Sequence, residues 1–193
     1  MNYKKLMDIH KTLFNCEDIA EALAQPLPSA RVLASRYVKN GLLTRVKKNA
    51  YILAGALTNC DTLEIFSIAN CLQVPSYISL QTALAYYEIT TQIQQSYVES
   101  ILLKRSLSYQ AEGFFFNYSK IDKSLYFGFN REKGFFIAEP EKAFLDCIYF
   151  SSLGRYSFDI GAVDLDKLDI QKIKQMSLAF PVRSRRLIEK WTT

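Results

Sequence analysis

The stretch that decides the fold is SARVLASRYVKNGLLTRVKKNAYIL, residues 29–53. At about 100° per residue, the apolar side chains of its first half gather on one side of a helix. These side chains are Ala30, Leu33, Ala34 and Tyr37. Ser29 is expected to cap this helix, and Gly41 is expected to end it after Asn40. The spacing therefore predicts a helix over residues 29–40 with one side free for binding.

The second half of the stretch predicts a β-hairpin. Residues 42–46 and 50–53 have the apolar and β-branched composition of two short strands. Lys47, Lys48 and Asn49 lie between them and are expected to form the turn, because asparagine tolerates the positive φ that such turns need. A basic hairpin is thus expected directly after the helix.

Two further helices are expected before this stretch. Residues 3–14 carry an apolar stripe at helical spacing, which would place His10 on the surface of a first helix. Asn15 is expected to cap a second helix over residues 16–24, and two prolines then break the chain. Three helices followed by a basic hairpin is the order of a winged helix-turn-helix, in which the third helix enters the major groove of DNA.

The composition changes after residue 57, where we place a domain boundary. Residues 1–57 form the expected winged helix-turn-helix domain, and residues 58–193 are neutral and rich in aromatic side chains. Several β-rich runs lie between residues 96 and 138, with helical patterns before and after them. The predicted fold class is therefore α+β, the larger second domain having a mostly antiparallel sheet and C-terminal helices.

The surplus of positive charge lies in the first third of the chain. The formal net charge is +5, and residues 1–57 carry nine Lys and Arg against four Asp and Glu, whereas residues 58–193 carry fifteen of each. No acidic residue occurs from Gln25 to Cys60. Charge of one sign in one region favours a polyanionic partner, so we expect binding to double-stranded DNA.

The candidate DNA-binding residues are Ser29, Arg31, Ser35, Arg36, Lys39, Arg45, Lys47 and Lys48. Arg31 and Arg36 are the candidates for base contacts, because a guanidinium bonds both acceptors of a guanine edge. Lys39 and the hairpin cations are expected to bind phosphates, and Ser29 with the helix N-terminus is expected to add a phosphate contact. The alternative is that these cations are simply the solvated side of an amphipathic helix. The helix order, the missing acids and the hairpin together favour DNA.

The remaining patterns argue against catalysis. No glycine-rich phosphate loop occurs, and one histidine with four scattered cysteines suggests neither a metal site nor a disulfide framework. We therefore expect no catalytic residue, metal or cofactor. The enzyme alternative is a metal-dependent nuclease using Glu139, Lys142 and Asp146, but these residues have the spacing of helix-dipole compensation and of an ordinary i, i+4 ion pair.

Two other features have more than one interpretation. The cluster of Arg183, Arg185, Arg186 and Lys190 near the C-terminus is expected to be a solvated helix end, with an extended DNA-binding face or a partner contact as alternatives. The aromatic runs GFFFNY and LYFGF favour a sheet core or a protein-interaction surface over a platform for single-stranded nucleic acid. Neither a signal-peptide core nor a long apolar run is visible, so we expect a cytoplasmic protein with no membrane partner.

The chain resembles the AbiEi-type antitoxins of type IV, or abortive-infection, toxin-antitoxin systems. The resemblance rests on GLLTRVKKNAYIL at residues 41–53, VPSYISLQTALAYYEI at 74–89 and FFIAEPEKAFLDCIYF at 135–150. One departure is Asn49, where the family tends to have glycine.

The resemblance implies a bacterial transcriptional regulator that binds repeats upstream of its own operon through its first domain and represses that operon, as a monomer or dimer on DNA. It also implies that the second domain counters a nucleotidyltransferase-like toxin without a stable complex. The alternative that the residues leave open is a winged-helix transcription factor whose second domain senses a ligand or dimerises, with no toxin partner.

Overall fold

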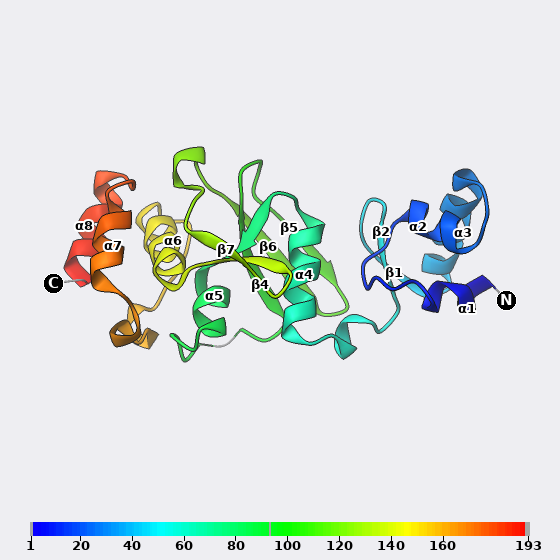
Figure 1. Cartoon of the computed structure of the whole chain (residues 1–193), viewed down its shortest axis with the longest axis horizontal. Helices are drawn as coiled ribbons and strands as arrows, with labels where there is room; N and C mark the ends of the chain where they lie inside the picture. The colour runs from blue at the N-terminus through cyan, green and yellow to red at the C-terminus, as the bar shows by residue number, and fades with distance from the viewer. Residues whose placement is uncertain (1, 93, 192–193) are drawn as a thin grey trace.

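The computed structural model describes residues 2–92 and 94–191. We call residues 2–57 the N-terminal part and residues 58–191 the C-terminal part, and they lie at opposite ends of an elongated molecule (Figure 1). The elements of the N-terminal part are α1 (Asn2–Met7), α2 (Cys16–Ala22), α3 (Leu27–Lys39), β1 (Leu43–Lys47) and β2 (Ala50–Leu53).

The first helix is shorter than predicted, because α1 ends at Met7 instead of continuing to Phe14. Phe14 forms an antiparallel bridge with Tyr51 of β2, through backbone hydrogen bonds of 3.0 and 2.8 Å. The bridge buries the Phe14 ring and requires extended backbone there, so a helix cannot reach this residue. His10 is therefore in the connection after α1, where it is exposed, and the prediction of a helical His10 is wrong.

The next two helices begin with different signals. Asn15 caps α2 as predicted: its side chain accepts from Asp18 N, and the Asp18 side chain accepts from Asn15 N. The prediction that Ser29 caps α3 is wrong, because α3 begins at Leu27 and Ser29 lies in its first turn. Pro28 makes this earlier start favourable, since its fixed φ suits a first turn and its missing N–H has no partner to lose there.

The C-terminal part is built around one sheet. Its strands are β3 (Ser76–Ile78), β4 (Tyr97–Leu102), β5 (Leu107–Ala111), β6 (Phe114–Lys120), β7 (Phe129–Glu132) and β8 (Phe135–Ala138). Its helices are α4 (Thr62–Leu72), α5 (Leu80–Tyr86), α6 (Pro140–Ser152), α7 (Ile170–Ser177) and α8 (Val182–Trp191), with 3-10 turns η2 (Lys123–Leu125), η3 (Ile160–Ala162) and η4 (Leu165–Lys167). A further 3-10 turn, η1 (Leu57–Asn59), joins the two parts. The chain is thus α+β, as predicted.

The sheet is mixed, with strand order β5-β6-β4-β3-β8-β7. Three neighbouring pairs are antiparallel, and two pairs, β4 with β6 and β3 with β8, are parallel. Helix α4 covers one face, where Tyr118 donates to Ala69 O, and α6 covers the other, where Tyr77 donates to Asp146. Helices α7 and α8 pack on the outer side of α6 (Figure 1).

Two hydrophobic cores meet at the β1–β2 hairpin. Leu43 and Tyr51 belong to the core of the N-terminal part, whereas Val46 and Ile52 belong to the core that surrounds the sheet. Alternation of side chains along a strand produces this division, since successive residues point to opposite sides. Among the residues that the structure describes, no helix is both long and apolar enough to cross a membrane.

Candidate nucleic-acid interface

The amphipathic character predicted for the third helix is confirmed in α3. Its apolar residues Ala30, Leu33, Ala34 and Tyr37 are buried. Its polar candidates Arg31, Ser35, Arg36 and Lys39 are exposed on the other side, which the C-terminal part does not cover. We call the exposed side chains of Arg31, Val32, Ser35, Arg36 and Lys39 the α3 face.

Val32 is the member of the α3 face that the sequence reasoning missed. Its side chain is 71% exposed, although valine is usually buried. On a helical projection it lies between Arg31 and Arg36 in angle, so the apolar surface is flanked by cations. The sequence does contain a signal for the exposure of Val32, because this residue lies outside the apolar stripe of the helix. An exposed methyl-bearing side chain among arginines offers a contact for the methyl group of thymine.

The polar side chains of the α3 face differ in how free they are. Ser35 Oγ donates to Arg31 O at 3.1 Å, so a phosphate would have to replace an internal hydrogen bond. The Arg36 guanidinium lies 6.0 Å from the centre of the Tyr37 ring, which holds it beside an aromatic face. Ser29 is exposed in the first turn, where N–H groups of a helix have no intrahelical acceptor.

The hairpin cations do not point in one direction. Arg45 and Lys48 are exposed, and Arg45 Nε donates to Lys47 O at 3.3 Å. Lys47 instead turns to the C-terminal part, where its Nζ donates to Leu72 O at 2.5 Å, and burial lowers its pKa. The register of the hairpin shifts between Arg45 and Lys47, and such a bulge re-aims a side chain. The structure therefore separates Lys47 from the other candidate cations.

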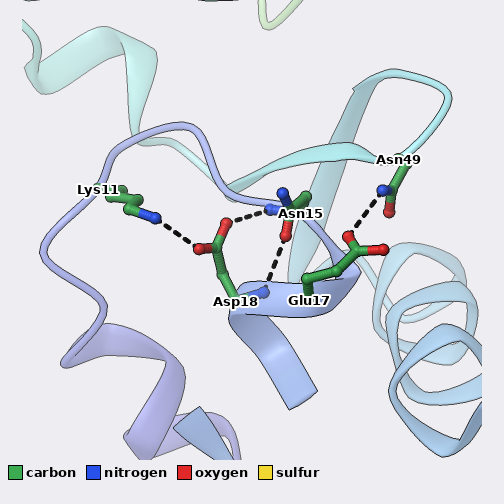
Figure 2. A network of polar contacts seen from close by, with 5 residues as sticks. All are labelled: Lys11, Asn15, Glu17, Asp18 and Asn49. Atoms are coloured by element: carbon green, nitrogen blue, oxygen red, sulfur yellow. Dashed lines mark hydrogen bonds and ion pairs between the residues drawn. The ribbon is translucent and has the colours of Figure 1, made fainter. Parts of the chain in front are cut away.

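Asn49 forms the hairpin turn with a φ of 57°, as predicted for this position. Its side chain also ties the turn to the start of α2, as Figure 2 shows for the contact with Glu17. Asn49 Nδ2 donates to Glu17 Oε2 at 2.9 Å, and Asn49 Oδ1 accepts from Cys16 N at 3.0 Å. Glycine would permit the same φ but would make neither bond.

A second set of polar contacts holds the start of α2. Asp18, which completes the cap with Asn15, also pairs with Lys11 at 2.6 Å (Figure 2). The hairpin turn, the α2 cap and the connection after α1 are therefore joined in one polar network. This network fixes the hairpin relative to the helices that precede α3.

Glu112 joins the hairpin to the sheet, a role that no local sequence pattern indicates. It lies in the turn between β5 and β6, and its carboxylate accepts from Thr44 Oγ1 at 2.7 Å. It also accepts from the backbone N–H groups of Gly55 at 2.8 Å and Leu57 at 3.0 Å. Hydrogen bonds to a charged acceptor are stronger than neutral ones. Glu112 therefore clamps the hairpin and the following connection against the sheet.

On α6, Lys142 and Asp146 form a buried ion pair and not an accessible site. Lys142 and Asp146 are fully buried and form the expected i, i+4 ion pair, which is not at the surface. Asp146 also accepts from Tyr77 at 3.1 Å and Ser79 at 2.8 Å. Burial lowers the pKa of Lys142 and raises that of Asp146, while their mutual attraction opposes both shifts.

These contacts leave two of the three residues of the nuclease alternative out of reach of a substrate. Glu139 pairs with Lys172 of α7 at 3.2 Å, and Lys142 and Asp146 have no exposed side-chain surface. Within residues 2–92 and 94–191, no three His, Cys, Asp or Glu side chains are grouped so that they could hold a metal. The buried pair of Lys142 and Asp146 therefore belongs to the packing of α6.

The second basic cluster lies on α8, at the opposite end of the molecule from α3 (Figure 1). Arg183, Arg186 and Lys190 are exposed there, whereas Arg185 is half-buried. The sheet of the C-terminal part lies between α8 and α3 (Figure 1). The two basic regions are therefore not one continuous surface.

No protein-family model matches the chain, and no curated protein matches its sequence. Its fold is similar to the crystal structure of the RV2827C protein from Mycobacterium tuberculosis, with a TM-score of 0.63 and 11% sequence identity. The similarity covers 97% of this chain and 74% of that chain. At this identity the comparison establishes a shared fold, and this chain has the α+β architecture of that protein.

Proposed function

We propose that this protein is a DNA-binding transcriptional regulator whose N-terminal part is a winged helix-turn-helix. The observation that carries the proposal is the α3 face: three cations around an exposed valine, on a helix followed by a basic hairpin. The sequence from Gln25 to Cys60, which contains α3 and the hairpin, has no acidic residue of its own. This arrangement suits a helix that enters a major groove.

In this proposal the two elements have different tasks. Arg31 and Arg36 read base edges, and Lys39 binds the phosphates beside the groove. Arg45 and Lys48 of the hairpin bind the flanking backbone. Lys47 does not bind DNA in this proposal. It anchors the hairpin to the C-terminal part, because its ammonium donates to Leu72 O at the end of α4.

The proposal includes the antitoxin function that the resemblance to AbiEi-type proteins implies. The segments at 74–89 and 135–150 support it, since they pack together through bonds from Tyr77 and Ser79 to Asp146. The protein would act in the cytoplasm, repress its own operon from upstream repeats as a monomer or dimer, and counter a nucleotidyltransferase-like toxin without a stable complex.

One observation favours the alternative of a ligand-sensing transcription factor without a toxin partner. A cavity of about 710 Å³ lies between α4, α5 and the start of β4, with Phe66, Tyr86, Val98 and Phe114 among its lining residues. A volume of this size fits a small molecule. Under this alternative, a ligand in the cavity would change DNA binding.

The test of DNA binding is fluorescence anisotropy of the full chain with a labelled duplex from upstream of its gene. Arg31→Ala and Arg36→Ala should each weaken binding by about 1 to 3 kcal/mol and relax sequence preference. Lys174→Ala on α7 is the control, because it removes one exposed cation far from α3. Equal binding by all four proteins would refute the assignment of the α3 face.

The test of the antitoxin function is co-expression of the intact chain with the adjacent open reading frame. Rescue of growth is expected if that frame encodes the toxin. A neighbour that is harmless when expressed alone, or growth arrest that the intact chain does not relieve, would favour the transcription factor without a toxin.

A further inference from the structure

A polar pocket of about 570 Å³ lies on the face of the sheet opposite α4. Tyr118 of β6 points toward α4, so its neighbours Asn117 and Ser119 point to the other face of the sheet. Asn117 is the register partner of Glu99 on the parallel strand β4, and both side chains line the pocket. A volume of this size is in the range of small-molecule sites.

Glu99 brings a buried carboxylate to this pocket without a cationic partner. Its side chain is 2% exposed, and none of the ion pairs among the described residues includes it. Gln81 N at 3.1 Å and the Tyr156 hydroxyl at 3.0 Å both donate to Glu99 Oε2, so Oε1 retains capacity to accept hydrogen bonds. A buried carboxylate without a cation is costly to ionise, and burial raises the pKa of Glu99 to about 7.

Arg155, which follows α6, brings the opposite charge to the same pocket. Its side chain is exposed and forms no ion pair within the part of the chain that the structure describes. A guanidinium suits a carboxylate, because its N–H groups can donate to both oxygens at once. The pocket therefore presents an acidic and a basic group, and each lacks a partner of opposite charge.

We propose that this pocket binds a free amino acid, whose ammonium group pairs with Glu99 Oε1 and whose carboxylate pairs with Arg155. Such a ligand supplies both charges that the pocket lacks. A simple cation would leave Arg155 without a partner, and a simple anion would leave Glu99 without one. Asn117 and Ser119 offer further hydrogen bonds to the polar atoms of the ligand.

The site is separate from those described above. The larger cavity of about 710 Å³ adjoins it and shares Gln94, Gln95 and Tyr97 with it, but Glu99 and Arg155 line only the smaller pocket. Neither Glu99 nor Arg155 belongs to the α3 face. The proposal therefore does not depend on DNA binding.

The experiment begins with thermal unfolding of the full chain at pH 8, with each of the standard amino acids added in millimolar excess. Because the pKa of Glu99 is about 7, this pH keeps its carboxylate largely ionised. A ligand of the folded state raises the unfolding midpoint, so at least one amino acid should raise it. Isothermal titration calorimetry then gives the affinity for that amino acid. Glu99→Gln and Arg155→Ala should each weaken binding about tenfold or more, because each leaves one charge of the ligand without its partner.

Two matched variants and one matched ligand separate recognition from a general change in structure. Glu21→Gln on α2 and Arg131→Ala on β7 remove the same charges outside the pocket and should bind as the wild type does. Amidation of the ligand's carboxylate should weaken binding to the wild type about tenfold but not binding to Arg155→Ala, in which the partner is already missing.

The proposal is overturned if no amino acid binds, or if Glu99→Gln and Arg155→Ala bind with wild-type affinity. It is also overturned if amidation of the ligand weakens binding to the wild type and to Arg155→Ala equally. Thermal unfolding without ligand confirms that each variant is folded. None of these measurements involves DNA, so their failure would leave the α3 face unaffected.

Discussion

The carboxylate of Glu112 accepts a hydrogen bond from the hydroxyl of Thr44, with 2.7 Å between the two oxygens. The residues are 68 positions apart, and their contact joins the turn of one hairpin to the strand of another. The same carboxylate also binds the N–H groups of Gly55 and Leu57. One side chain thus secures both the β1–β2 hairpin and the connection between the two parts of the chain.

Replacing Glu112 should loosen this junction. Glu112→Ala removes three hydrogen bonds to a charged acceptor, so we expect the free energy of unfolding to fall by about 2 to 3 kcal/mol. Thr44→Val should cost about 1 kcal/mol in the wild type and almost nothing in the Glu112→Ala background. Urea denaturation of the four proteins measures this coupling. Additive effects of the two substitutions would show that the bond does not contribute.

Asn49 should be more favourable than the glycine typical of the resembling family. Asn49→Gly keeps the positive φ but loses the bonds to Cys16 N and Glu17, so stability should fall by about 1 kcal/mol. Asn49→Ala loses the same bonds and adds the steric cost of alanine in this region, about 1 kcal/mol more. Denaturant midpoints in the order wild type, Gly, Ala are expected. A glycine variant as stable as the wild type would contradict a tether through the side chain.

Val32 should recognise a thymine methyl group if the α3 face binds DNA. Replacing thymine by deoxyuridine at one operator position should weaken wild-type binding by about 0.8 kcal/mol, which is roughly fourfold. Val32→Ala should lose this sensitivity while it still responds to guanine changes read by arginine. Anisotropy titrations with duplexes substituted at single positions measure both effects. Sensitivity to deoxyuridine that persists in Val32→Ala would assign the methyl contact to another side chain.

Glu99 should make the stability of the protein depend on pH. It is 2% exposed, and burial raises its pKa to about 7, although bonds from Tyr156 and Gln81 oppose the shift. The folded protein therefore holds a proton that the unfolded chain releases near its ordinary pKa of 4.5. Stability from this group is present at low pH and is lost as pH rises through 7, by about 3 kcal/mol in total.

Glu99→Gln isolates this effect, because glutamine keeps the size of the side chain and does not titrate. Relative to the wild type, the variant should gain stability between pH 5 and pH 8, as urea denaturation at the two values would show. A constant difference between the two proteins across this range would contradict a titrating Glu99.

The sequence predicted best those features that depend on neighbouring residues. The buried side of α3, the cap at Asn15 and the turn at Asn49 follow from local spacing and side-chain chemistry, and all three are confirmed. The winged-helix assignment and the DNA contacts stay predictions. The start of α3 before Ser29 could also have been found, because Pro28 is typical of a first turn.

The missed features depend on contacts between distant segments. Phe14 leaves the first helix because it pairs with Tyr51, and Lys47 turns away from the solvent because a bulge directs it to Leu72. Neither partner is visible from local spacing. The pair of Lys142 and Asp146 has the spacing of a surface ion pair, and only the packing of α6 against the sheet and its neighbouring helices buries it.

The division of the β1–β2 hairpin between two cores limits how this architecture can be rebuilt. A hybrid protein that joins residues 1–57 to an unrelated second half would carry Val46 and Ile52 to a surface that offers them no apolar partner. The hairpin and the sheet edge must therefore change together during evolution. The exposed side of α3 is freer to change, because the main contacts of this helix are with α2 and β1.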